Sequence, residues 1–467
     1  MTVSLREHAP SVLVATLSAA FGVSLLQITD ALAAIVAADE VTGSSGMVRL
    51  VLALLGGVFI AIALYVGAVV TANTFATIIA GRTRTIALLR LIGATARSQR
   101  RAVAREGVVV GLVGSALGAL VGTGVSAALL GAAVAGGLAP ALPYPLVSPL
   151  AALPLLAVVL TTWLASWVGS RRVLEVSPVQ ATGAAVERNH DESGHRRGRN
   201  ITAVVLLALG AVLLVGGMAI GSVSPIGILP AVIGGMLSFT GFVLGAQLIM
   251  PPALRAAGRL FGARAGGAPA RLAAANALRY PERSTRTTIG LVIGVALVTM
   301  FAVAAATYSD VLGSAFDADP EADAQIAAVI QTTVVIFSAL LGFSALIAAV
   351  GLVNNLSLSV LQRTRELGLL RSLGFTRGQV RRMIALESAQ LTLTAVSVGL
   401  VIGTVYGWAG AQSLLASLPG TPAVIAPSIP LGFVGGVAMV AALLTLAATI
   451  APSRRATRVS PVLALAE

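Results

Sequence analysis

One segment of this chain occurs twice, and no other feature constrains its fold as strongly. Residues 82–106 are RTRTIALLRLIGATARSQRRAVARE, and residues 363–387, which lie 281 positions later, are RTRELGLLRSLGFTRGQVRRMIALE. The copies share an Arg-Thr-Arg start, a Leu-Leu-Arg centre, a glycine, a threonine, a pair of arginines and a final glutamate. Similarity at a fixed spacing indicates that a whole structural unit has been duplicated.

Both copies are basic segments between long apolar runs. Hydrophobic residues make up 57% of the chain and charged residues 10%, whereas soluble domains carry about 25% charged residues. The sequence is therefore that of a polytopic membrane protein, and a helix needs about 20 apolar residues to cross a bilayer. We predict an all-α protein with ten membrane spans, the first of which is retained rather than cleaved as a signal. The spans are residues 11–36, 48–79, 105–136, 148–170, 201–220, 227–250, 287–309, 325–355, 385–414 and 428–450.

The arginines predict the orientation of these spans. If the N-terminus is cytoplasmic, every arginine except Arg49 lies on the inside, while the outer loops hold acidic residues. This distribution follows the positive-inside rule, so both termini are predicted to be cytoplasmic. The net charge of +13 then suits anionic lipids or an acidic protein surface. No nucleic-acid partner is expected, because no aromatic residues are interleaved with the arginines.

The repeat divides the chain into four spans, two linking spans and four spans. Both units end alike, with SRRVLEVSPV at residues 170–179 and SRRATRVSPV at residues 453–462. The predicted boundaries are residues 1–182 for the first unit, 183–286 for a linker with two spans, and 287–467 for the second unit. Within the linker, residues 251–286 are predicted to form an interfacial helix that breaks before Pro281.

Composition excludes several chemistries for this chain. It has no cysteine, which rules out disulfides, thiolate metal sites and cysteine nucleophiles. All of its basic residues are arginines, so it lacks the lysine of a Walker A phosphate loop. The three histidines lie outside the apolar runs, and no metal site is expected. We therefore expect a non-catalytic chain that does not hydrolyse ATP by itself.

The repeated segment has the pattern of two helices joined by a tight turn. Leucines at helical spacing precede Gly374, a residue suited to the end of a helix. Thr376 and Gln379 have the spacing of a capping box that starts the next helix. The first copy keeps Gly93 and Thr95 but has serine at the position of Gln379. A helix pair of this kind would project beneath the bilayer and act as a lever on the adjoining spans.

Small residues and carboxylates supply the other candidate sites. Gly118 and Gly122 match Gly399 and Gly403 in the repeat, and glycines four residues apart let membrane helices approach closely. Asp30, Glu106 and Glu387 are the candidates for binding substrate or ions. The two glutamates also suit the start of a helix, where the helix dipole favours a negative charge. Asp30 is either functional within the membrane or reaches the outer interface.

Taken together, the motifs resemble the FtsX-like permease family, the membrane subunits of MacB- and LolC/LolE-type ABC transporters. The resemblance is carried by the two copies of the repeated segment, the two Val-Ser-Pro-Val endings, and the NALRYPER segment at residues 276–283. It implies a coupling helix in each unit that docks on a separately encoded ATPase, in two copies, which would bind ATP and Mg. The coupling residues implied are Arg84, Leu88, Leu89, Arg90 and Gly93 in the first unit, and Arg365, Glu366, Leu369, Leu370, Arg371 and Gly374 in the second. This chain departs from MacB-like members because its outer loops are short.

Three functions are consistent with these observations. The first is an ABC transporter permease in a bacterial inner membrane, which moves a hydrophobic or amphiphilic substrate (lipid, lipoprotein, peptide or drug-like) by mechanotransmission. The second is an ion-coupled secondary transporter that uses the three carboxylates named above. The third is an ATPase-linked signalling or scaffold membrane protein. Paired charges inside the spans would favour the second, and these are scarce in the sequence.

Overall fold

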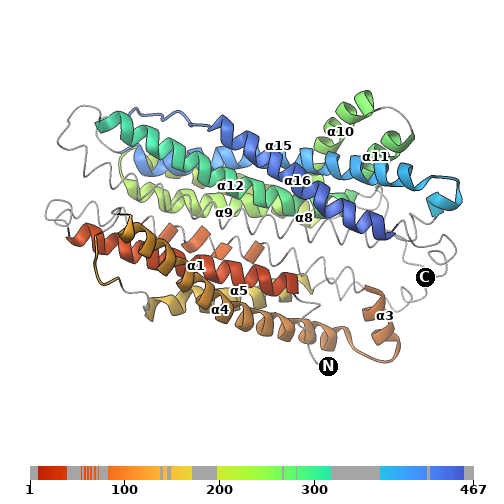
Figure 1. Cartoon of the computed structure of the whole chain (residues 1–467), viewed down its shortest axis with the longest axis horizontal. Helices are drawn as coiled ribbons and strands as arrows, with labels where there is room; N and C mark the ends of the chain where they lie inside the picture. The colour runs from red at the N-terminus through yellow and green to blue at the C-terminus, as the bar shows by residue number, and fades with distance from the viewer. Residues whose placement is uncertain are drawn as a thin grey trace.

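The computed structural model of the chain is a long helical bundle (Figure 1). It describes residues 9–38, 83–136, 140–144, 149–170, 197–265, 268–279, 281–316, 369–417 and 421–456, and separate residues between 54 and 72. Throughout these residues the regular structure is helical, without a strand. The helices are α1 (Ala9–Ala38), α3 (Thr83–Leu91), α4 (Ala96–Ala135), α5 (Ala152–Gly169), α8 (Arg197–Gly221), α9 (Ile228–Leu244), α10 (Ala246–Ala265), α11 (Ala268–Arg279), α12 (Pro281–Phe316), α15 (Arg377–Leu415) and α16 (Leu431–Ala456).

Seven helical segments in the described residues are long and apolar enough to cross a membrane. They correspond to the predicted first, third, fourth, fifth, sixth, seventh and ninth spans. The predicted tenth span lies in α16, whose apolar stretch is shorter (Gly432–Leu443). The predicted span 48–79 lies mostly, and the span 325–355 entirely, outside the described residues. The chain is thus a multi-pass protein, and its described residues form helices only.

The two repeats pack their helices in the same way. In the first unit α1 lies against α4 and α4 against α5, while in the second unit α12 lies against α15 and α15 against α16. The first two helices of each set run parallel, because successive glycines of α4 and α15 meet successive residues of the partner helix. Equivalent sequences therefore produce equivalent helix pairs.

Glycines make these parallel helix pairs very close. A Cβ atom added at Gly122 would lie 2.6 Å from the Ala20 carbonyl oxygen, and one added at Gly403 would lie 2.5 Å from that of Ala296. Gly118 and Gly399 are equally confined, by Ala19 and Val295. Backbones that approach this closely gain dispersion contacts along their length, which is the main source of helix association inside a bilayer.

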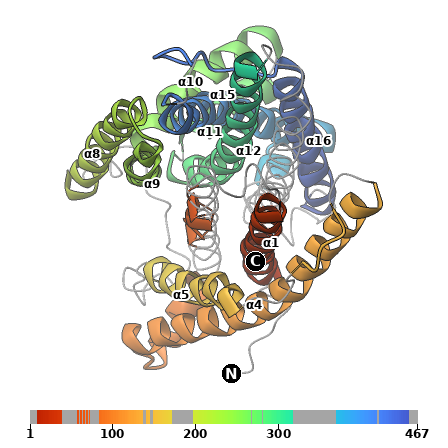
Figure 2. The same cartoon turned by 90° about the vertical axis from the view of Figure 1, so that its left-hand side faces the viewer.

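The linking helices α8 and α9 form a hairpin that packs on the second unit. Both helices contact α15, and in the view along the bundle they lie at its periphery beside α15 (Figure 2). Side-chain hydrogen bonds from two tyrosines help to fix α9. Ser238 Oγ and Tyr406 Oη of α15 are 2.8 Å apart, and Tyr65 Oη donates to the Met236 carbonyl at 3.0 Å.

The segment after α9 differs from the single interfacial helix that the sequence predicted. The break before Pro281 is present, since α12 begins at that proline, a position that suits proline because its missing amide is not needed there. Before it, however, the chain forms two helices, α10 and α11. The apolar face of α11 rests on the start of α15, which gives these short helices a stable place outside the spans.

A branched side chain at Gly403 tests the close helix contact. Gly403→Val should force α12 and α15 apart and lower the unfolding free energy by about 1–3 kcal/mol, the usual cost of overpacking. The measurement is the thermal unfolding midpoint of the detergent-solubilised protein. Gly435→Val on the exposed side of α16 is the matched control, because a Cβ there has open space. Equal midpoints for the two variants would contradict the packing argument.

Candidate functional site

Each repeat contains the same helix-turn-helix element outside the apolar stretches. In the first, α3 ends at Leu91 and α4 begins at Ala96. The Ala94 amide donates to the Leu89 carbonyl at 2.9 Å, and the Gly93 amide to the Arg90 carbonyl at 3.2 Å. This pair of bonds is the Schellman motif, which closes a helix through a left-handed residue.

The second repeat reproduces this turn bond for bond. The Phe375 amide donates to the Leu370 carbonyl at 3.1 Å, and the Gly374 amide to the Arg371 carbonyl at 3.2 Å. In the described part of the chain, positive φ angles occur only at Gly93 (101°) and Gly374 (96°). Glycine adopts this conformation without the steric cost that a Cβ atom imposes. The identity of glycine in both copies thus has a local physical cause.

A threonine caps the helix that follows each turn. Thr376 Oγ1 accepts from the Gln379 amide at 3.2 Å, and the Gln379 side chain accepts from the Thr376 amide at 2.9 Å, so the capping box is complete. In the first copy Thr95 Oγ1 accepts from the Ser98 amide at 3.1 Å. Ser98 Oγ instead donates to the Thr95 carbonyl at 2.8 Å. Both α4 and α15 therefore have defined starting points.

Large apolar side chains are exposed at the tip of each element. Ile92 and Leu373, which match in the repeat, are 82% and 72% exposed. Leu88 and Leu369, also a matched pair, are 49% and 51% exposed. Leu89 and Leu370 lie deeper and are half-buried. Exposed apolar groups of this kind, outside the membrane spans and rimmed by arginines, are typical of surfaces that bind another protein.

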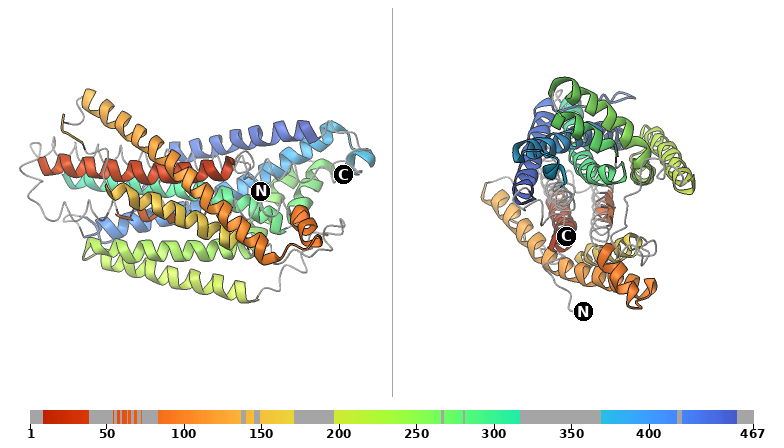
Figure 3. Two further views of the ribbon diagram at one scale, coloured as in Figure 1. Left: turned by 90° about the horizontal axis from the view of Figure 1, so that it is seen from below. Right: turned by 90° about the vertical axis from the view of Figure 1, so that its right-hand side faces the viewer.

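The two elements lie at the same end of the bundle. In Figure 1 and in the left view of Figure 3, α3 and the light-blue residues 369–376 occupy one end, from which α4 and α15 run toward the other. α4 has 40 residues and α15 has 39, so each is about 60 Å long, about twice the hydrocarbon thickness. Each is therefore long enough to reach from its turn across a bilayer as one continuous helix.

Different contacts hold the N-terminal parts of α4 and α15. On α4, the Arg100 guanidinium lies 3.9 Å from the centre of the Trp167 ring, and Arg100 Nε donates to Ser170 Oγ at 3.2 Å. These contacts fasten α4 to α5. On α15, the apolar residues Val380, Met383 and Ile384 pack against Ala273 of α11. Sequence patterns did not indicate this second support, because the residues that meet are about a hundred positions apart.

The remaining predicted residues are placed as follows. Arg84 lies in α3, Arg90 and Arg371 are half-buried beside the turns, and Arg365 and Glu366 lie outside the described residues.

The candidate carboxylates Asp30, Glu106 and Glu387 are not brought together. Gln27 Nε2 donates to Thr123 Oγ1 at 3.1 Å, which places the Asp30 end of α1 about 30 Å along α4 from Glu106. Glu387 is buried on α15, in the other unit. No cluster of potential metal ligands occurs in the described residues.

Comparison with known proteins identifies the family. The sequence matches the family described as FtsX-like permease C-terminal at residues 57–178 and again at residues 338–461, which together make up more than half of the chain. The chain belongs to the FtsX-like permease family, and it contains two copies of the family's repeat. Proteins of this family are ABC transporter permeases, which are transport components.

Two proteins of Bacillus subtilis (strain 168) are similar to parts of this chain. One is the uncharacterized ABC transporter permease YknZ, 34% identical over 116 residues, which are 25% of this chain and 27% of that protein. The other is the ABC transporter permease YtrF, 31% identical over 55 residues, which are 12% of this chain and 13% of that protein. The chain thus covers about a quarter or less of the length of these relatives.

An alanine at Gly374 tests the left-handed turn. Gly374→Ala places a Cβ in a conformation that costs about 1–2 kcal/mol, which should speed amide exchange in residues 370–376 by a factor of roughly 5 to 30. Hydrogen-exchange mass spectrometry measures this change. Gly378→Ala, in the first turn of α15, is the control, because a Cβ there meets only Thr376 Oγ1, at 3.9 Å. Similar exchange in the two variants would show that the turn does not need a left-handed residue.

Proposed function

We propose that this chain is the permease subunit of an ABC transporter in a bacterial inner membrane, driven by a separately encoded ATPase. It has ten spans in a 4+2+4 order, with both termini cytoplasmic. Each helix-turn-helix element is a coupling element that docks one ATPase subunit, so two subunits bind one permease. ATP and Mg are bound by those partners, and this chain contributes no catalytic residue.

The observation that carries this proposal is the matched pair of exposed apolar tips at one end of the bundle. Ile92 and Leu373 would each enter an apolar depression on an ATPase subunit, where full burial of such a side chain is worth about 1.5–3 kcal/mol. The arginines around the tips suit an acidic rim on the partner and speed its association. Two equivalent tips also suit two identical ATPase subunits, one bound at each tip.

The long helices would transmit the motion of the ATPase across the membrane. When ATP draws two ATPase subunits together, the two tips approach each other, and α4 and α15 tilt with them. Because α1 and α12 are held against these helices at the glycine contacts, each pair moves as one body. The motion therefore reaches the half of the membrane opposite the coupling elements without a closed channel between the units.

The proposed substrate is hydrophobic or amphiphilic and is taken from the membrane. The spans expose apolar side chains, including Leu120, Val212 and Leu443, and the three candidate carboxylates are too far apart to form one ion site. This separation gives the ion-coupled alternative no structural support. The signalling alternative shares the docking step and differs in that no substrate moves.

Aspartate substitutions at the tips test the docking of two ATPase subunits. We expect Leu88→Asp or Leu369→Asp to lower the ATPase content of the nucleotide-free complex from two copies per permease to one. The double variant should lose both copies, because an unpaired charge is costly to bury in an apolar interface. Native mass spectrometry of the tagged permease, purified from its own host, gives the stoichiometry directly.

A charge change elsewhere at the same end of the bundle is the control for this experiment. Ala275→Asp lies on the exposed side of α11 and should leave two copies bound. Docking at the tips is wrong if the double variant of Leu88 and Leu369 retains its ATPase. The absence of any ATPase from the wild-type complex would contradict the transporter proposal itself.

A further inference from the structure

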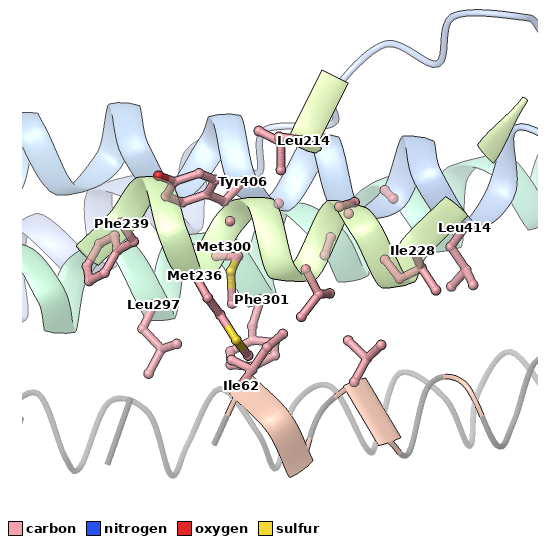
Figure 4. A pocket seen from close by; sticks show the side chains of 18 of the residues that line it. Ile62, Leu214, Ile228, Met236, Phe239, Leu297, Met300, Phe301, Tyr406 and Leu414 are labelled. Carbon is pink, nitrogen blue, oxygen red and sulfur yellow. The ribbon is translucent and has the colours of Figure 1, made fainter. Parts of the chain in front are cut away.

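An apolar cavity lies between the linking helix α9 and the second unit. Its volume is about 140 Å³. One wall is α9, others are α12 and α15, and the last is formed by Val58, Ile62 and Tyr65, which precede the first coupling element in the chain. Figure 4 shows Met236 of α9 pointing toward Ile62 and Phe301, with Leu297 and Met300 beside them. The cavity is partly open to its surroundings.

Small residues on two opposing helices create this space. Gly235 of α9 and Gly410 of α15 both line the cavity. A Cβ added at Gly410 would meet nothing within 4 Å, and one added at Gly235 would meet only Leu214 Cδ1, at 4.0 Å. These glycines differ from Gly403 and the others at the helix contacts, where no Cβ fits. They leave room that side chains do not fill.

The hydroxyl groups near the cavity are already bonded to protein atoms. Tyr65 Oη is 2.8 Å from Thr240 Oγ1 in addition to its bond to the Met236 carbonyl. Tyr406 Oη is bonded to Ser238 Oγ. Tyr65 and Tyr406 therefore present ring carbons to the space. Apart from Tyr308, the other lining residues in the described part of the chain carry apolar side chains or none. Apolar cavities of about 150 Å³ stay free of water and bind small hydrocarbons.

The cavity extends from the middle of the spans into the half farthest from the coupling elements, and Ile293 and Leu297 continue its lining a short way into the nearer half. Ala304 and Tyr308 belong to the last third of the span Thr288–Val311, Phe301 lies just past its middle, and Gly410 and Leu414 lie near the end of α15. At this depth the surrounding molecules are the hydrocarbon tails of one leaflet. Among the described residues, none that lines the cavity carries a charged side chain.

We propose that this cavity binds one acyl chain of a membrane lipid from the leaflet opposite the coupling elements. The chain enters from the side on which the cavity is open, and its end lies among Met236, Met300 and Phe301. Methionine side chains adapt to flexible apolar partners of this kind. The site extends beyond the proposed transport function, since it holds a lipid whether or not an ATPase is bound.

Photolabelling tests this site. The purified permease is reconstituted in nanodiscs of phosphatidylglycerol that carries a diazirine near the end of one acyl chain, irradiated, and mapped by mass spectrometry. We expect label on Phe301 or its lining neighbours. Lipids around the protein cannot reach Phe301 from outside, because its side chain is 2% exposed. Labelling of the exposed Val212 and Leu443 serves as the internal reference.

Filling the cavity provides the matched comparison. Gly235→Leu with Gly410→Leu occupies the space from both sides and should reduce labelling of the lining residues at least fivefold relative to the reference. Gly124→Leu with Gly216→Leu is the control, because both glycines lie in membrane helices, have open space around a Cβ and are absent from the cavity wall. Labelling in this control should equal that of the wild type.

The wild-type result decides the proposal even if a filled variant fails to fold. Absence of label from the cavity wall, with normal labelling of Val212 and Leu443, would overturn it. So would wall labelling that persists at full strength in a folded, filled variant. Retention of the ATPase by the double variant of Leu88 and Leu369, with wall labelling intact, would count against the docking proposal alone.

Discussion

The close approach of α4 to α1, and of α15 to α12, is the constraint on which the rest of this structure depends. In a bilayer the hydrophobic effect does not drive helices together, so association depends on how well their surfaces fit. Gly122 and Gly403 allow backbone atoms to meet where any side chain would collide. A long helix fixed in this way to a second helix resists bending, and only such a helix can carry a displacement from one side of a membrane to the other.

The turns at Gly93 and Gly374 place a short helix at the end of each long one. Each turn is closed by two backbone hydrogen bonds and followed by a threonine cap, so its geometry is fixed by local sequence rather than by contacts with the remainder of the protein. The supports behind the turns differ, with Arg100 on Trp167 in the first unit and α11 in the second. The two units therefore have the same turn structure, but different contacts hold the helix behind each turn. Exchanging tips between the halves would separate the role of the tip from that of its support.

Much of this architecture could be predicted from the sequence, and the exceptions have physical causes. Seven of the ten predicted spans, the glycine turns and the Thr376–Gln379 cap are present in the described residues. Each depends on residues close together in the chain, so its pattern is visible in the sequence. The contact of α11 with Met383 and the cavity beside Phe301 join residues that are far apart in the chain. Nothing in the periodicity of either segment indicates such a meeting. The roles of all the predicted site residues stay predictions, and Arg365 and Glu366 also lie outside the described part of the chain.

The central claim is that the two coupling elements move relative to each other when ATP binds to the partner. The chain has no cysteine, so Arg97→Cys and Gly378→Cys, at exposed and repeat-matched positions in the first turns of α4 and α15, can be spin-labelled selectively. Pulsed electron–electron double resonance would then measure the distance between the two spin labels in the ATPase-bound permease, first without nucleotide and then with ATP trapped. The account predicts a shorter distance with ATP. An unchanged distance distribution, in a complex shown to bind ATP, would contradict it.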